Sequence, residues 1–371
     1  MDEPISMDEV SELARELVSI PSETGKEKEV ALFIRDYLAP FSDVRLQRVG
    51  DERFNVISRL GRGRRVLFSG HIDTVPVGDE SLWHFNPYGE IRGGRLYGRG
   101  ACDMKGPLAA MLASIKALSK EELGFELIFA GVVGEEVDGA GTKALGSGFD
   151  LALIGEPTDM KIVRAHKGSV WLEIETKGEE MHSSEVEYEL AKRANSIYKM
   201  AKIVLKLEGY ELELEKRVDP LLSHPTVNVG VIEGGRRANV VPGSCRITVD
   251  RRLLPEEGLE GVLSEIGGLL DPLGIEYGLR VVEFREACEV PEDSEIVRLC
   301  KEALGEVGVS PIVAGYKATS DMSILVNKGV PTVMVGPGRP EEAHRVDESI
   351  ELDQLHLASR FYYRFAKLIS P

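Results

Sequence analysis

The sequence predicts an α/β protein in which a mostly parallel central sheet is flanked by helices, with a smaller α+β unit inserted into it. In the first part of the chain, short apolar runs alternate with helical stretches, as in parallel sheets. After residue 168 the runs alternate polar and apolar residues, which is typical of half-buried antiparallel strands. The first pattern returns near residue 288. A chain of 371 residues also exceeds the size at which one hydrophobic core stops growing.

Individual elements follow from the same periodicities. Ser6 and Glu9 form a capping box, which predicts a helix that ends before Pro21. Further helices are expected at 26–39, 105–120, 188–207, 257–270 and 294–308. Strands are expected at 64–70, 126–134, 150–155 and 331–336 in the first pattern, and at 169–178 and 244–255 in the second. We therefore expect a main domain formed by residues 1–168 and 288–371, with residues 169–287 as the inserted domain.

Composition excludes several classes of partner. The chain has 45 basic and 62 acidic side chains and a formal charge of −17, which opposes binding to nucleic acid or to an anionic membrane. No apolar stretch is long enough for a membrane span, and the first residues lack the pattern of a signal peptide. The four cysteines are too scattered for a disulfide framework or a Cys-x-x-Cys metal site. We expect a cytoplasmic protein with reduced thiols.

Histidine and carboxylate side chains follow the predicted strands of the main domain. His71 and Asp73 come directly after the strand at 64–70. The other members of this set are Asp103, Glu135, Glu136, Glu156 and His344. Because the carboxyl ends of parallel strands meet at one edge of a sheet, these side chains are expected to converge. Solvated acidic residues on the surface of an acidic protein are the alternative for any one of them.

A converging set of carboxylates needs positive charge. Four carboxylates within a few ångströms cannot all stay ionised without compensation, and two divalent cations would supply it. Zinc accepts both imidazole and carboxylate ligands. Glu135 and Glu136 are neighbours, and adjacent side chains on an extended backbone point in opposite directions. We therefore expect Glu136 to be a metal ligand and Glu135 to be the general base.

Seven short motifs together resemble a known family. In chain order they are SGHIDTVP, GRGACDMKG, GEEVDGAGT, GEPT, HSS, NVVPG and AHRVDE. They are similar to the co-catalytic zinc amidohydrolases, which include acetylornithine deacetylase, succinyl-diaminopimelate desuccinylase, aminoacylase and glutamate carboxypeptidase. The resemblance spans about residues 8 to 368. It implies a zinc-exopeptidase-like catalytic domain and an inserted, ferredoxin-like lid and dimerisation domain.

The resemblance also implies roles for the residues of the main domain. His71 and Glu156 would bind one Zn²⁺, His344 and Glu136 the other, and Asp103 would bridge both, with Co²⁺ as a possible substitute. Asp73 would accept a hydrogen bond from the far nitrogen of His71 and so fix its tautomer. Glu135 would take a proton from water and deliver it to the departing amine. A cis peptide between Asp103 and Met104 is also implied.

Other residues are candidates for contact with substrate. The resemblance implies that His182 hydrogen-bonds the developing oxyanion, often from the partner subunit of a homodimer. Arg252 aligns with an arginine that grips the substrate carboxylate, and Arg251 would then face the other way on the strand. Asn239, Gly336 and Gly338 would line the substrate pocket, or they could equally serve as turn residues.

The expected activity is hydrolysis of the amide bond of a small N-acyl amino acid, in the manner of amino-acid biosynthetic deacetylases and desuccinylases. A dipeptidase or carboxypeptidase would need the same metals and the same base, so it remains the main alternative. A relative that binds metal without catalysis is a further alternative. A nucleotide-binding protein is disfavoured because the glycine motifs lack the required spacing. The sequence does not specify the acyl group.

Overall fold

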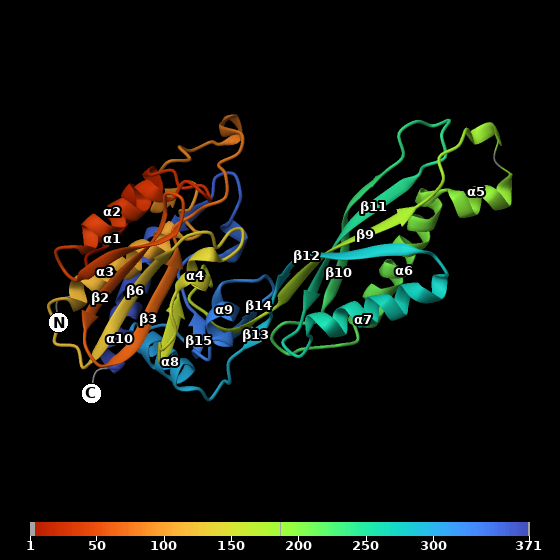
Figure 1. Ribbon diagram of the computed structural model, residues 1–371. Coiled ribbons are helices and arrows are strands. Elements are labelled where there is room, and N and C mark those ends of the chain that lie inside the picture. Colours follow the sequence, from red (N-terminus) through yellow and green to blue (C-terminus); the bar gives the residue numbers. More distant parts are fainter. Residues whose placement is uncertain (1–3, 186, 370–371) are drawn as a thin grey trace. The chain divides into compact units, whose positions relative to one another are not determined.

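The protein consists of two compact units in a computed structural model that describes residues 4–185 and 187–369 (Figure 1). The first unit comprises Met1–Arg164, Val290–Ala314 and Ser320–Pro371. The second comprises Ala165–Glu289 together with the short segment Gly315–Thr319. The chain therefore leaves the first unit, forms the second, and returns, which is the arrangement of an inserted domain.

Within the described residues, the central sheet has nine strands and mixed direction. Their order is β1 (Asp43–Gly50), β2 (Arg53–Gly61), β6 (Phe125–Val132), β3 (Arg64–His71), β7 (Leu151–Ile154), β15 (Thr332–Met334), β8 (Ile162–His166) and β13 (Cys288–Glu289), and β14 (Val313–Tyr316) also pairs with β8. The pairs β6–β3, β3–β7 and β7–β15 in the centre are parallel. β1 and β2 are antiparallel because only a tight turn joins them. The predicted α/β class is confirmed, and the parallel central strands include those that lead to the site.

Helices cover this sheet (Figure 1). They are α1 (Met7–Ser19), α2 (Lys28–Leu38), α3 (Lys105–Leu118), α4 (Ala140–Ala144), α8 (Glu295–Glu306), α9 (Met322–Asn327) and α10 (Leu352–Ile369). The Ser6 half of the expected capping box is confirmed, since the Ser6 hydroxyl accepts the N–H of Glu9 at 3.1 Å, whereas the Glu9 carboxylate pairs with Lys116 at 2.6 Å. Phe68 of β3 is fully buried, and its ring contacts those of Tyr362 and Phe365 on α10. This aromatic contact packs α10 against the central strand that ends at His71. A small sheet of β4 (Glu90–Arg92), β5 (Arg95–Tyr97) and β16 (Ser349–Glu351) completes the unit.

The second unit is an antiparallel sheet with helices. Its strand order is β10 (Thr226–Gly234), β11 (Ser244–Leu253), β9 (Gly168–Lys177) and β12 (Tyr277–Arg285). The helices are α5 (Tyr188–Ala194), α6 (Ser196–Leu214) and α7 (Leu259–Leu270). The single helix expected at 188–207 is two helices, because the Asn195 side chain accepts the N–H of Tyr198 and caps α6. Alternate residues of β9 and β11 form the core with α6 and α7.

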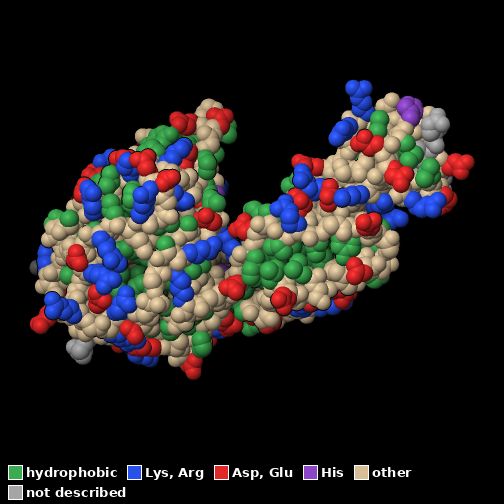
Figure 2. All heavy atoms as spheres, viewed as in Figure 1, with side chains coloured by type: hydrophobic (Ala, Val, Ile, Leu, Met, Phe, Trp, Pro, Cys, Tyr) green, Lys and Arg blue, Asp and Glu red, His purple; other side chains and the backbone are tan. Residues whose placement is uncertain are grey.

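Charged side chains of both signs are interspersed over the face of each unit that is visible in Figure 2. In the part of the chain that the structure describes, no helix is long and apolar enough to cross a lipid bilayer. The four cysteines are all buried free thiols.

Candidate metal centre

The carboxyl ends of three parallel strands present the predicted site residues. His71 is the last residue of β3, and Glu156 lies two residues after the end of β7. Glu135 and Glu136 follow β6, the neighbour of β3 on the other side. Asp103 lies in the turn that leads into α3, and His344 lies in the loop before β16. Parallel pairing is therefore what brings the first four of these residues to one edge of the sheet.

The side chains converge as expected. The Nε2 atom of His71 lies 2.9 Å from Oδ1 of Asp103 and 3.9 Å from Oε1 of Glu156. The Nε2 atom of His344 lies 3.3 Å from Oδ2 of Asp103 and 3.1 Å from the Glu136 carboxylate. Asp103 thus contacts a histidine with each of its oxygens. This central position between the two histidines is the one expected for a bridging ligand.

Burial and mutual repulsion perturb the titration of these groups. Burial raises the pKa of Glu135 well above its usual value, and the charges of Glu156 and Asp321 add to this effect. Burial also raises the pKa of Glu156 to about 8, although His71 opposes the shift. Hydrogen bonds to Asp103 and Glu136 raise the pKa of His344 to about 10. The carboxylates around His344 therefore favour positive charge at this site, and neutral histidines would leave their charge uncompensated.

This donor set fits divalent cations. Ligand atoms of His71, Glu135 and Glu156 lie within 4.8 Å of one another, and so do those of His71, Asp103 and Glu136. Imidazole nitrogen with carboxylate oxygen is a ligand combination that zinc accepts. Positive charge placed among these groups would oppose the effects of burial and of the neighbouring carboxylates, which raise the pKa of Glu156. The residues present are thus chemically suited to hold cations.

Asp73 differs from the expectation in what its carboxylate contacts. The Nδ1 atom of His71 lies 2.8 Å from the backbone carbonyl oxygen of Asp73, whereas the carboxylate Oδ1 is 3.7 Å away. The carboxylate instead accepts the backbone N–H groups of Gly134, Glu135 and Glu136 at 2.9, 3.2 and 3.3 Å. The backbone of Asp73 therefore orients His71, and its side chain holds the segment that carries the two glutamates. The expected cis peptide between Asp103 and Met104 is present.

Comparison with known proteins identifies the family. The sequence profile of peptidase family M20/M25/M40 matches residues 67–368. The chain belongs to this family. Its members include metallohydrolases with a dinuclear metal site, which agrees with the convergence of His71, His344 and the four carboxylates. The sequence-based prediction of a metal-dependent hydrolase is therefore confirmed.

Two relatives with similar sequences are acetylornithine deacetylases. The protein from Proteus mirabilis (strain HI4320) is 30% identical over 365 residues, which are 92% of this chain and 92% of that protein. The protein from Myxococcus xanthus is 33% identical over 328 residues, covering 84% of this chain and 82% of that protein.

Two solved structures with a similar fold are peptidases. Aminopeptidase PepT from Bacillus cereus superposes with a TM-score of 0.84 at 21% identity, covering 99% of this chain and 100% of that chain. An M20 family metallo-carboxypeptidase from Sulfolobus solfataricus has a TM-score of 0.78 at 23% identity, covering 100% and 99%. These similarities establish the fold and leave the substrate open.

The second unit carries the other predicted substrate contacts. His182 and Asn239 are both exposed, and a β-bridge joins His182 to Val240. Arg251 is fully buried and pairs with Glu257 at 2.6 Å. Arg252, the favoured candidate, is half-buried beside Asp250 at 3.0 Å. The two arginines thus face opposite sides of β11, as strand geometry requires.

Gly336 and Gly338 have packing roles in this M20 chain. The N–H of Gly336 is donated to the Thr158 hydroxyl, and the N–H of Gly338 is donated to the side chain of Gln354. A Cβ atom on Gly336 would lie 2.4 Å from the backbone oxygen of Glu156, so glycine allows the close approach of these two segments. These contacts favour the alternative of turn chemistry over N–H groups offered to substrate.

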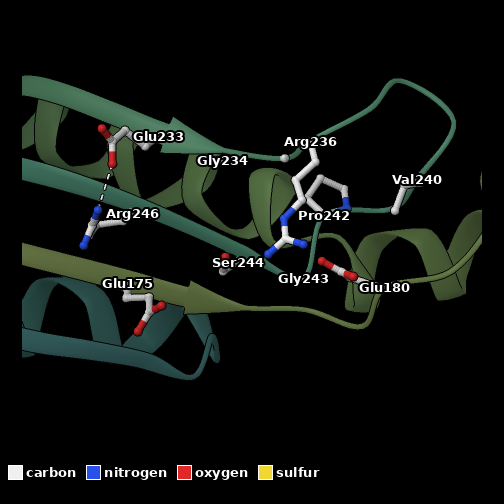
Figure 3. A pocket seen from close by; sticks show the side chains of 11 residues that line it. Glu175, Glu180, Glu233, Gly234, Arg236, Val240, Pro242, Gly243, Ser244 and Arg246 are labelled. Atoms are coloured by element: carbon white, nitrogen blue, oxygen red, sulfur yellow. Dashed lines mark hydrogen bonds and ion pairs between the residues drawn. The ribbon is translucent and has the colours of Figure 1, made fainter.

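A pocket of about 300 Å³ lies in the second unit. Figure 3 shows Glu175, Glu180, Glu233, Arg236 and Arg246 among its lining residues, with Glu233 and Arg246 joined at 2.8 Å. Its lining contains none of the predicted metal ligands, so this pocket is not the metal centre.

Two buried residues at the centre escaped the sequence analysis. Glu348 accepts the backbone N–H of Asp103, and its partner Arg99 donates to it at 2.6 Å. Asp321 is also buried, and its charge contributes to the raised pKa of Glu135. In the sequence, Glu348 and Asp321 are each recognisable only as an acidic residue among turn-forming neighbours. This local pattern does not distinguish a buried carboxylate from a solvated one.

Proposed function

We propose that the protein hydrolyses the amide bond of a small N-acyl amino acid, as acetylornithine deacetylase does. The observation that carries this proposal is the group of four carboxylates and two histidines described above. The relatives named acetylornithine deacetylase support the substrate class, because they match nearly the full length of the chain. Four reduced, buried thiols agree with a place in the cytoplasm, where such amino-acid biosynthesis would occur.

Two Zn²⁺ ions, with Co²⁺ as a substitute, are the proposed cofactors. His71 and Glu156 would hold one ion, His344 and Glu136 the other, and Asp103 both. A solved relative from Bacillus subtilis described as a dinuclear metal-binding M20 peptidase supports the stoichiometry (16% identity, TM-score 0.75, covering 98% of each chain). Bound cations would polarise the amide carbonyl and lower the pKa of a nearby water.

Glu135 is the proposed general base. It is buried, and one of its carboxylate oxygens lies within 4.8 Å of ligand atoms of His71 and Glu156, so it is placed to exchange a proton with a water held among these groups. It would take one proton from the attacking water while the carbon–oxygen bond forms. It would then give that proton to the amide nitrogen as the carbon–nitrogen bond breaks, which releases a carboxylic acid and an amine, and the remaining proton of the acid passes to the amine to give a carboxylate and an ammonium.

His182 is proposed to donate a hydrogen bond to the oxyanion. The backbone N–H of Ser184 points to its Nδ1 atom at 3.3 Å, so Nδ1 is an acceptor and Nε2 carries the proton. An exposed Nε2–H is therefore available as a donor. Arg252 is proposed to bind the substrate carboxylate, and Asn239 is proposed to line the substrate pocket with its side-chain amide. For His182→Ala we expect a lower kcat with unchanged metal content, and a loss of metal would contradict this role.

A peptidase of the same family is the second candidate, because the structural neighbours are an aminopeptidase and a carboxypeptidase. The deciding experiment is a hydrolysis screen of the zinc-loaded protein with N-acetyl-ornithine, N-succinyl-diaminopimelate, other N-acyl amino acids and dipeptides. We expect the highest kcat/KM with an N-acyl amino acid. Preference for a peptide with a free amino terminus would overturn the deacylase assignment and favour a dipeptidase.

The metal and base assignments are tested separately. Protein stripped by a chelator should be inactive and should regain activity with zinc or cobalt. Glu135→Gln should keep its metal but lose activity about 10²–10⁴-fold, the usual contribution of a general base. Full activity of the stripped protein would remove the metal mechanism, and an unchanged rate for the Glu135 variant would remove its role as base.

We further propose a homodimer through the second unit. Tyr198, Leu205 and Leu212 recur every seven residues on the exposed side of α6, and Leu205 is 65% exposed. The edge strand β10 exposes Val231 and Ile232. Figure 2 shows hydrophobic side chains gathered on the visible face of this unit. Such exposed apolar groups mark protein contacts.

Light scattering of the proposed dimer should give twice the chain mass, and Leu205→Glu should reduce the measured mass to that of one chain. A wild-type monomer would contradict the proposal.

A further inference from the structure

Glu348 occupies an unusual place beside the metal centre. Its side chain is fully buried, although it is not one of the proposed ligands. Its Oε1 atom accepts the backbone N–H groups of Cys102 and Asp103 at 2.9 and 3.0 Å. Its Oε2 atom accepts a hydrogen bond from Arg99 at 2.6 Å. All three contacts lie on the segment that leads into the proposed bridging ligand.

Glu348 also lies close in sequence to His344, which is on the other side of the proposed centre. His344 precedes Glu348 by four residues, and its Nε2 atom lies 3.3 Å from Oδ2 of Asp103. Within this loop His344 and Asp347 both have positive φ angles, of 62° and 59°. Such angles are unfavourable for residues other than glycine, so surrounding contacts must hold the loop. Asp347 contributes one of these contacts by accepting the backbone N–H of His84 at 2.8 Å.

Arg99 supplies the charge that a buried carboxylate requires. Only 7% of Arg99 is exposed, and its guanidinium also donates to the carbonyl oxygen of Pro76 at 3.2 Å. It lies over the ring of Trp83, 5.4 Å from the centroid. An isolated buried carboxylate would be costly, whereas one that has a cation and two N–H donors is stable. The Arg99–Glu348 pair is thus a rigid link between the two segments.

We infer that Glu348, held by Arg99, is a positioning residue that fixes the separation between the metal ligands Asp103 and His344. The inference rests on the proposed metal centre. The two ligands come from segments about 240 residues apart in the chain. These segments also meet in the β5–β16 pairing and where the Gly98 N–H is donated to the backbone oxygen of Glu348, but the Glu348 side chain is the group that contacts the Asp103 backbone itself. Residues that orient metal ligands typically change metal affinity by about 10–100-fold when they are replaced. Glu348 would act in the same way, through the backbone of one ligand and the loop of the other.

The test uses Glu348→Ala, Glu348→Gln and a matched control. Glu351 pairs with Arg95 at 2.8 Å across β5 and β16, but it is more exposed, and neither Arg95 nor its second partner Arg339, at 3.7 Å, is a proposed ligand. Glu351→Gln therefore removes a similar ion pair without touching the centre. Each full-length protein is stripped of metal and titrated with Co²⁺, and the visible absorption of the bound ion is recorded. Unfolding of the metal-free proteins is measured in parallel.

The wild type and Glu351→Gln should bind two Co²⁺ with the same affinity and spectrum. For Glu348→Ala, which leaves two N–H groups without an acceptor, we expect at least one ion to bind about 100-fold more weakly with an altered spectrum. Glu348→Gln keeps an oxygen for both N–H groups and should lose about 10-fold, a partial rescue. If Glu348→Ala does not fold, Glu348→Gln decides alone.

Wild-type affinity and spectrum in the folded Glu348 variants would overturn the inference, even if the metal-free variants were less stable. That result would leave the proposed function intact, because the wild type would still bind two ions. A wild-type protein that binds no Co²⁺ would instead remove the metal centre itself, and the positioning role with it.

Discussion

Asp73→Asn is the sharpest perturbation of the segment that carries Glu135 and Glu136. The amide oxygen of asparagine can replace Oδ1 and keep the N–H groups of Gly134 and Glu135, at 2.9 and 3.2 Å in the wild type. The new NH₂ group then faces the N–H of Glu136, where Oδ2 accepted it at 3.3 Å. The Thr24 hydroxyl, 2.7 Å from Oδ2, can rotate and accept instead of donating.

The expected loss of folding free energy follows from these changes in hydrogen bonding. One buried N–H, that of Glu136, loses its acceptor, which costs about 1–3 kcal/mol. If the same strain displaces the Glu136 carboxylate, Co²⁺ affinity should fall about 5–150-fold, since 1.4 kcal/mol corresponds to a factor of ten. Thr24→Val is the matched control. It removes one hydrogen bond to the same carboxylate but leaves all three backbone bonds, so it should destabilise the protein without weakening metal binding.

Both variants are measured by urea unfolding in the presence of a chelator and by Co²⁺ titration of the stripped protein. Asp73→Asn should reduce both the free energy of unfolding and metal affinity. The interpretation would be refuted if Asp73→Asn unfolded like the wild type, or if it bound Co²⁺ as tightly as Thr24→Val.

Three further predictions concern residues away from the centre. Arg251→Ala should reduce the free energy of unfolding by about 3–5 kcal/mol, because the partly buried Glu257 carboxylate loses its closest partner. Arg252→Ala should change the free energy of unfolding by less than about 1 kcal/mol, and it should raise KM. Urea unfolding and steady-state kinetics test this pair, and equal destabilisation by both variants would contradict the assigned faces of β11. Burial raises the pKa of Cys288 to about 12. The protonated Cys288 thiol therefore contributes its full share of stability below the unfolded thiol pKa of about 8.5, and this contribution declines as the pH rises toward 12. Native protein should therefore show no rapidly reacting thiol at pH 8, and rapid labelling of Cys288 would refute this. Asn195→Ala should cost about 1 kcal/mol in thermal unfolding by removing the cap of α6, and an unchanged melting temperature would argue against the cap.

Local patterns were informative wherever one element specifies its own structure. The Ser6 cap, the inserted unit and the strand that ends at His71 follow from spacing within short windows, because periodicity and capping are local properties. The convergence of His71, Glu135, Glu136 and Glu156 was also predictable, since parallel strands end at a common edge, whereas Asp103 and His344 reach the cluster from a turn and a loop. The split of the helix near Asn195 was missed because an asparagine within an apolar pattern gives only a weak signal against the helical period.

Tertiary structure alone decided which charged groups are buried and what they contact. Asp73 directs its carboxylate to the backbone of the Glu135 segment, and Glu348 accepts the backbone N–H of Asp103 and pairs with Arg99, although these partners are distant in the chain. Sequence identifies an acidic residue, but its environment depends on which distant N–H groups the fold places within 3 Å. The sequence by itself therefore determined the chemistry of the centre, and the packing of distant segments determined how that chemistry is held in place.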